Sequence, residues 1–179
     1  MSDQRWYRHP EMIVALAAVV LSVFTVLVGA YSASIDRAYA RASVWPRLEM
    51  GRSFSQGSYS YIVSNRGTGP ALVEQVRMAV RQQPQQDWQG ILDAHGVGEQ
   101  RRYAQSQIDA RTISAGQELQ VFHTEDQALI KQLLDPAAPP MEVEICYCSI
   151  YQQCWTVDQG NRPMEVERCA IPEAQRFRQ

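Results

Sequence analysis

The sequence of 179 residues is poor in lysine and histidine, with one lysine and three histidines beside sixteen arginines. Its formal net charge is −2 and it contains no long run of like charges, so it lacks the basic surplus that attracts nucleic acid. It has no internal repeat and no GK[ST] sequence, and a phosphate-binding loop needs that lysine. These absences argue against a nucleic-acid partner and against a P-loop nucleotide-binding protein.

A recognisable catalytic constellation is also missing. His95 lies two residues after Asp93, and His123 precedes Glu125 and Asp126, so each group offers an acid–base pair in sequence. No nucleophile at a recognisable elbow accompanies either group. We therefore expect no catalysis, and the sequence predicts no metal ion or other cofactor.

One segment is long and entirely uncharged. Met12–Ala30 comprises nineteen residues without a charged side chain, which as a helix can cross a hydrocarbon layer about 30 Å thick. Pro10 suits the first turn of such a helix. We predict a cytoplasmic tail over residues 1–11, a transmembrane helix over residues 12–33 and a helical juxtamembrane linker over residues 34–43, with the lipid bilayer around Met12–Ala30.

Two other interpretations of this segment stay open. A cleaved secretory signal has a shorter apolar run and a more basic start, although Ala30–Ala33 offers small residues for cleavage. A buried core helix is the second interpretation. Ala15, Ala18 and Ser22 are spaced three and four residues apart, so this face suits either a neighbouring helix or lipid.

The orientation follows from the cysteines rather than from the flanking charges. Two arginines precede the helix and three follow it closely, namely Arg5, Arg8, Arg37, Arg41 and Arg47, so the positive-inside rule decides nothing. All four cysteines fall in the last 34 residues, and an even number fits disulfides formed in an oxidising compartment. We predict a single-pass protein of a bacterial inner membrane, with a cytoplasmic N-terminus and a periplasmic domain over residues 44–179; the arginine bias suits a GC-rich bacterial genome.

The C-terminal region has the length of one domain and reads mainly as strands. Strand-forming residues predict strands over residues 44–50, 59–63 and 72–80, and a strand pair, 110–113 and 118–123, around the turn Ser114–Gln117. Leu119, Val121 and His123 are expected on one face of the last strand. Two short helices are expected within residues 87–96 and 124–134. Short strands with frequent turns predict an immunoglobulin-like β-sandwich.

The segment Ser64–Ala71 contains two glycines followed by Pro70. We interpret it as a turn in which Gly67 and Gly69 adopt backbone angles that other residues avoid. The alternative of a phosphate-binding loop lacks the lysine and the helix that such a loop needs.

The cysteine-rich segment Met141–Val157 predicts a β-hairpin with a specific register. If Cys148 lies opposite Cys154, Tyr147 pairs with Trp155 and Ile145 with Val157, so the core side chains share one face. Opposed residues lie near disulfide distance, whereas Cys146 and Cys148, two apart on one strand, do not. We favour the disulfides Cys148–Cys154 and Cys146–Cys169, with Cys146–Cys154 and Cys148–Cys169 as the alternative.

Two functional interpretations of these cysteines compete with structural disulfides. The pair Cys146 and Cys148 suits thiol exchange, but no basic residue within the motif lowers the pKa of a thiol. Four cysteines can also bind zinc or copper(I), although their spacing differs from that of common zinc ribbons. At the tip of the hairpin, Tyr151, Gln152 and Gln153 are candidate contacts for a partner protein, since tyrosine is frequent in binding hot spots.

Three segments carry a family resemblance: Val44–Pro46, Asn65–Ala71 and Cys146–Trp155. They are similar to recurring segments of uncharacterised proteobacterial single-pass membrane proteins with an exported β-rich domain and a CYCSxYxxCW segment. The resemblance covers most of the chain and implies architecture, not chemistry.

We therefore expect a membrane-anchored periplasmic binding or accessory protein without catalytic activity. It would act on an envelope protein through its β domain, with its helix as a second candidate contact. A periplasmic thiol-redox or metal-handling protein is the alternative.

Overall fold

The computed structural model describes residues 10–98 and 102–178. The chain divides into two compact units, Met1–Ala42 and Ser43–Gln179. The first nine residues of the predicted cytoplasmic tail lie outside the described residues.

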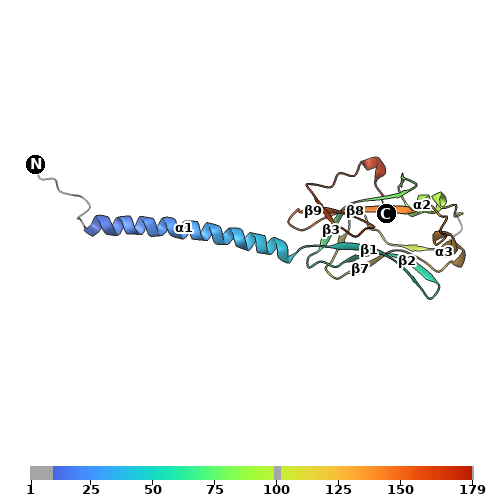
Figure 1. Ribbon diagram of the computed structural model, residues 1–179, viewed down its shortest axis with the longest axis horizontal. Coiled ribbons are helices and arrows are strands. Elements are labelled where there is room, and N and C mark those ends of the chain that lie inside the picture. Colours follow the sequence, from blue (N-terminus) through green and yellow to red (C-terminus); the bar gives the residue numbers. More distant parts are fainter. Residues whose placement is uncertain (1–9, 99–101, 179) are drawn as a thin grey trace, which may run out of the picture. The chain divides into compact units, whose positions relative to one another are not determined.

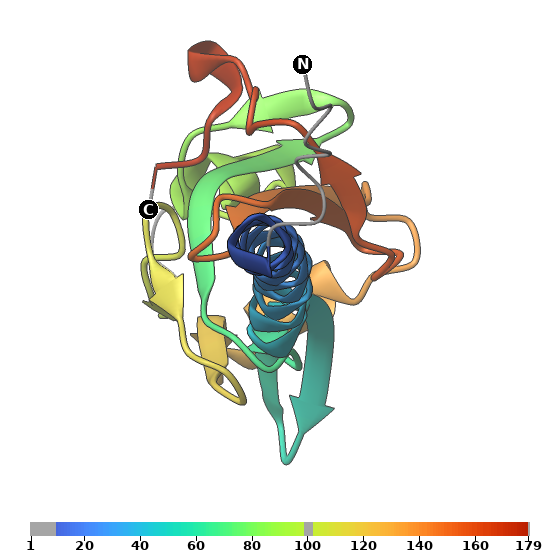
Figure 2. The same ribbon diagram turned by 90° about the vertical axis from the view of Figure 1, so that its left-hand side faces the viewer.

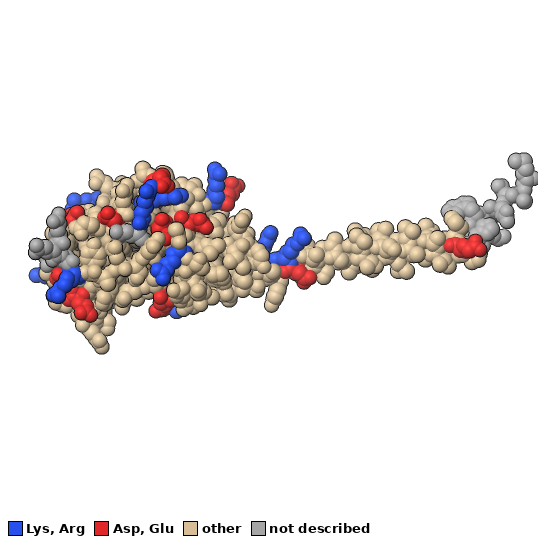
Figure 3. Space-filling view, turned by 180° about the vertical axis from the view of Figure 1, so that it is seen from behind, with Lys and Arg blue, Asp and Glu red and all other residues tan. Residues whose placement is uncertain are grey.

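The N-terminal unit is one helix, α1 (Pro10–Ser43), of 34 residues, none of which is buried. It is long and apolar enough to cross a membrane, and Figure 3 shows a charge-free stretch between Glu11 and the charged residues near its end. The hydroxyls of Ser22 and Thr25 donate to carbonyls one turn earlier, both at 2.8 Å. Polar atoms inside this stretch are thus satisfied within the helix, as a hydrocarbon environment requires.

The second unit is a sandwich-like domain of two antiparallel sheets with two short α-helices (Figures 1 and 2). The strands of the first sheet have the order β1-β2-β7-β5. They are β1 (Leu48–Ser55), β2 (Ser58–Asn65), β7 (Glu118–Thr124) and β5 (Ala104–Gln105).

The second sheet has the order β10-β9-β8-β3-β4, and β6 also pairs with β3. Its strands are β3 (Ala71–Val80), β4 (Gln83–Gln85), β6 (Thr112–Ile113), β8 (Met141–Cys148), β9 (Cys154–Asp158) and β10 (Met164–Val166). The mixture of two sheets and short helices confirms the coarse prediction of a sandwich-like β domain.

Two capped helices close one end of the sandwich, opposite to the start of β1 (Figure 1). They are α2 (Trp88–Ala94) and α3 (Gln127–Leu133); a short 3-10 helix, η2 (Glu173–Gln175), follows near the C-terminus. The Asp87 carboxylate accepts from Gly90 N at 2.7 Å, and the Asp126 carboxylate accepts from Ala128 N at 3.0 Å. Both helices occur where the sequence predicted them, because their N-cap residues satisfy amides that the first turn leaves unpaired.

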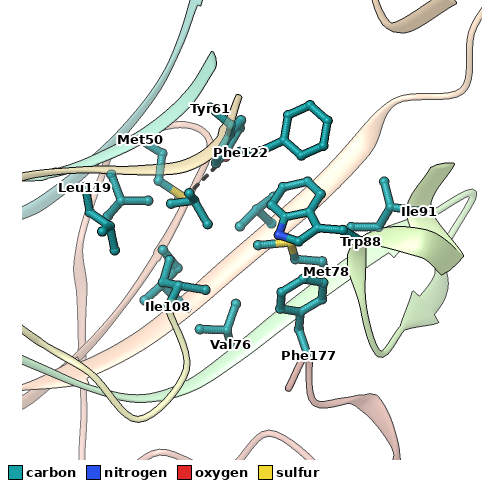
Figure 4. Close-up of a cluster of buried hydrophobic side chains, with 14 of the residues drawn as sticks. Met50, Tyr61, Val76, Met78, Trp88, Ile91, Ile108, Leu119, Phe122 and Phe177 are labelled. Atoms are coloured by element: carbon teal, nitrogen blue, oxygen red, sulfur yellow. Dashed lines mark hydrogen bonds between the residues drawn. The ribbon is translucent and has the colours of Figure 1, made fainter. Parts of the chain in front are cut away.

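Aromatic side chains join α2 to both sheets. Trp88 lies against Phe122 of β7, with ring centroids 4.7 Å apart, and against Phe177 at 5.5 Å. Figure 4 shows Trp88 between these rings and beside Met78. All four side chains are buried, so burial of apolar surface fixes α2 on the open end of the sandwich.

Three local predictions were wrong. The first strand begins at Leu48 and runs to Ser55, not from 44 to 50. Ala110–Ile113 does not form a hairpin with β7, because β6 pairs with β3 in the other sheet. His123 does not share a face with Leu119, because a bulge at Val121 shifts the register and places His123 opposite Ser60, whose hydroxyl lies 2.9 Å from the imidazole Nδ1.

The prediction of unusual glycine angles between β2 and β3 was also wrong. Neither Gly67 nor Gly69 has a positive φ. A Cβ at Gly69 would lie 2.0 Å from the carbonyl oxygen of Val44, and one at Gly67 would lie 2.3 Å from that of Trp45. Glycine is required here because the backbone of residues 44–47 passes too close for any side chain.

Candidate functional site

The β8–β9 hairpin has the register that the sequence predicted. Cys148 lies opposite Cys154, Tyr147 opposite Trp155 and Ile145 opposite Val157. The rings of Tyr147 and Trp155 pack with centroids 5.9 Å apart, and the buried phenol of Tyr147 accepts from Leu48 N at 3.4 Å. The hairpin is therefore anchored to the first sheet through its core face.

Two disulfides cross-link this hairpin. Cys148–Cys154 joins opposed residues with Cα atoms 4.0 Å apart, and Cys146–Cys169, with Cα atoms 5.7 Å apart, fixes the C-terminal segment to β8. This is the pairing that the register favoured, and it leaves no cysteine free. The Sγ atoms of Cys148, Cys154 and Cys169 lie within 4.8 Å of one another.

The hairpin tip, Ser149–Gln153, is closed by hydrogen bonds directly above the Cys148–Cys154 disulfide. Ser149 N donates to Gln153 O at 2.8 Å, and Gln152 N donates to Ser149 O at 3.0 Å. The buried Ser149 hydroxyl accepts from Tyr151 N at 3.2 Å and Gln153 N at 3.3 Å. A serine at the base of a tight tip satisfies amides that would otherwise be unpaired.

This closed tip presents apolar side chains to the surface. Ile150 is 50% exposed and Tyr151 is 46% exposed. Gln152, also exposed, has a φ of 61° in the left-handed region, whereas Gln153 is half-buried. The predicted contact residues therefore lie together on a tip whose backbone is fixed in advance, and such preorganisation lowers the entropy lost on binding.

The tip belongs to the end of the domain at which the chain leaves α1. Cys148 lies opposite Leu72 at the start of β3, and the segment 65–70 before β3 packs against residues 44–47. We call this region, comprising residues 44–47, 65–72 and 148–154, the tethered end.

Asn65 holds the tethered end together, and nothing in the sequence singled it out beyond its place in the turn. Its side-chain amide donates to Gly69 O at 2.8 Å and to Ile113 O at 3.0 Å. Its side-chain oxygen accepts from Gly67 N at 3.0 Å and Arg47 N at 3.2 Å. The fully buried amide thus uses its whole hydrogen-bonding capacity.

The opposite end contains a cavity of about 290 Å³. It lies between the β1–β2 hairpin, α2, the end of α3 and the loop 134–140, which together we call the helical end. Sequence reasoning missed four of its polar residues, Arg52, Tyr59, Tyr61 and Gln159; His95 and Asp135 also line it. The alternation of Tyr59 and Tyr61 marks one face of β2 but carries no signal that a cavity faces them.

The acidic and histidine residues form no acid–base pair at Asp93. The Asp93 carboxylate accepts from Gln89 at 2.8 Å, while both ring nitrogens of His95 face backbone carbonyls. His123 Nε2 lies 3.8 Å from a carboxylate oxygen of Glu125, and Asp126 caps α3. The structure therefore brings His123 and Glu125 together, whereas Asp93, His95 and Asp126 contact other groups.

Comparison of the sequence with protein-family models and with curated proteins finds no match.

Proposed function

We propose that this chain is a membrane-anchored, non-catalytic binding or accessory protein that presents its β domain to an envelope protein. In this proposal α1 spans the bacterial inner membrane with its N-terminus in the cytoplasm. The C-terminal domain then lies in the periplasm, where its four cysteines form disulfides.

The closed tip carries this proposal. It combines two exposed apolar side chains, Ile150 and Tyr151, with a backbone fixed by Ser149 and by the Cys148–Cys154 disulfide. Hot spots of protein interfaces are enriched in tyrosine, and rigid loops lose little entropy when they bind.

The strand order supports an immunoglobulin-like fold. The order β1-β2-β7-β5 corresponds to the ABED sheet of that fold, and β9-β8-β3-β4 corresponds to strands G, F, C and C′. The tip then occupies the F–G loop and residues 65–70 occupy the B–C loop, which in variable domains lie together at the binding end. The disulfides join other positions than the B–F bridge of antibody domains, so this correspondence concerns topology alone.

Photocrosslinking in native membranes tests the contact. The photoreactive residue p-benzoylphenylalanine is placed at Tyr151 in the full chain, or at Phe54 as a matched control, because Phe54 is 58% exposed at the other end of the domain, beside the β1–β2 turn. We expect one discrete protein adduct from position 151 that disappears when Ile150→Asp is added, and none from position 54. Equal adducts from both positions, or none from position 151, would contradict the proposal.

A second candidate function is thiol exchange, supported by the proximity of three Sγ atoms. A dithiol donor would reduce Cys148–Cys154, and a released thiolate would attack Cys169 Sγ and expel the Cys146 thiolate. In a disulfide-reduction assay the wild-type chain would then reduce the substrate faster than the Cys148→Ser/Cys154→Ser variant. Equal rates would reject this candidate. A metal-handling role has weaker support, because cysteines in disulfides offer no thiolate ligand.

A further inference from the structure

The cavity at the helical end has apolar walls and a polar mouth. Its walls include Trp88 and Ile91 of α2, Phe122 of β7 and Leu133 of α3. Its volume of about 290 Å³ lies at the small end of the range for ligand sites. The space opens to solvent beside the exposed Arg52, so a small molecule can reach its apolar walls.

The wall formed by the loop 134–140 is braced rather than collapsed into the space. His95 Nδ1 lies 2.7 Å from Ile91 O, and Nε2 lies 3.0 Å from Pro139 O, so the ring bridges α2 and the loop. The Asp135 carboxylate accepts from Ala137 N at 2.8 Å. Three prolines in this loop restrict its backbone further.

The polar mouth carries one cation and several hydrogen-bonding groups. Arg52 is exposed and lines the cavity together with Tyr59, and no carboxylate of residues 10–98 and 102–178 lies within 4.0 Å of its guanidinium. Tyr61 lies deeper, with its hydroxyl 3.5 Å from the weakly accepting Sδ of Met50 (Figure 4). Burial raises the pKa of Tyr59 and raises that of Tyr61 to about 12, so both phenols keep their protons at neutral pH.

We propose that this cavity binds a small organic carboxylate whose aromatic or branched aliphatic body fills the apolar part. The carboxylate would accept from the Arg52 guanidinium and the Tyr59 hydroxyl, and the body would lie against Trp88 and Phe122. An organic cation fits less well, because Arg52 stands at the mouth and the nearest acid on the wall, Asp135, already accepts from Ala137. This site shares no residue with the tip at the tethered end, so its test is independent of the test of the proposed function.

The test is calorimetric titration of the full chain in lipid nanodiscs, with empty nanodiscs subtracted. The probes are 3-phenylpropionate, the neutral 3-phenylpropan-1-ol and the cationic 3-phenylpropylamine. We expect saturable binding of the acid, and binding of the alcohol and the amine weaker by about 10- to 100-fold, as for the loss of a hydrogen bond to a charged group. Arg52→Gln should lower the affinity for the acid by the same factor and leave the affinity for the alcohol unchanged.

A variant that fills the cavity separates this site from partition into lipid. Ala138 lines the cavity, whereas its exposed neighbour Ala137 does not. Ala138→Trp should abolish saturable binding, and the matched control Ala137→Trp should retain it, with both variants keeping the wild-type thermal midpoint. Binding that survives Ala138→Trp, an amine that binds as tightly as the acid, or no saturable binding of the acid to the wild-type chain would overturn the proposal.

Discussion

The tethered end and the helical end of the β domain are held together by different means. The tethered end is fixed by the Cys148–Cys154 disulfide, by the four hydrogen bonds of the Asn65 side chain and by backbone in direct contact at Gly67 and Gly69. The helical end is fixed by apolar burial around Trp88 and by a few bridges such as His95, and it contains a cavity. A cross-linked end suits recognition of a protein surface, and an end with a cavity suits a small ligand.

The strongest test of the tethered end is Gly69→Ala. The new Cβ would lie 2.0 Å from the backbone oxygen of Val44. The backbone of residues 44–47 would have to move away to relieve this clash, and its contacts with residues 66–69 would break. We expect the free energy of unfolding to fall by more than about 3 kcal/mol, measured by urea denaturation of the full chain in detergent. Gly51→Ala is the matched control, since nothing lies within 4 Å of its Cβ position; similar losses in both variants would break the comparison.

The two disulfides should contribute different amounts to the free energy of unfolding. Cys146–Cys169 closes a separation of 23 residues and Cys148–Cys154 one of 6. The loop-entropy relation gives about 3.5 kcal/mol for the first and about 2.4 kcal/mol for the second. Paired serine variants, compared by urea denaturation, should rank in that order, and the reverse order would mean that the hairpin bond acts through more than chain entropy.

Alkaline titration probes Tyr61, a buried residue in the lining of the cavity. Burial raises the pKa of Tyr61 to about 12, whereas an unfolded tyrosine titrates near 10. Below pH 10 both states keep the proton, and between about pH 10 and 12 the unfolded chain loses it first, so stability falls as pH rises. Tyr61 should account for about 2 to 3 kcal/mol of this fall; an equally steep fall in Tyr61→Phe would contradict the assignment.

The smallest expected effect is that of His95→Ala at the helical end. Loss of its bridge to Pro139 should cost about 1 kcal/mol and speed amide exchange in the loop 134–140, measured by hydrogen–deuterium exchange with mass spectrometry. His123→Ala is the control, because His123 contacts Ser60 on the outer face of the first sheet. Unchanged exchange in the loop after His95→Ala would show that other contacts brace it.

Sequence patterns predicted local features well and long-range ones poorly. The alternation in Met141–Cys148 and the four cysteines together determine one hairpin register, and Asp87 marks the start of α2. By contrast, the pairing of β6 with β3 depends on how the two sheets meet, and the need for glycine at 67 and 69 depends on residues 44–47, which lie much earlier in the chain. The bulge at Val121 turned His123 outward without any local signal.

The cavity could not be predicted from the sequence, because it also depends on long-range packing. Its lining comes from β1, β2, α2, β7, the end of α3 and the loop after it, the start of β8, and Gln159 just after β9. Only the packing of those elements brings Arg52 near Gln159. The exposed tip was within reach, because a hairpin register also defines which residues form the turn.

The most direct test of the account is the state of the four cysteines in the full chain taken from its membrane. Cells are lysed in an alkylating agent, the chain is digested by chymotrypsin, which cuts after Tyr147 and so separates Cys146 from Cys148, and the peptides are measured without reduction. We predict linked peptides Cys146–Cys169 and Cys148–Cys154 and no alkylated cysteine. Alkylated cysteines in most of the chains would contradict a disulfide-stapled domain on the oxidising side of the membrane.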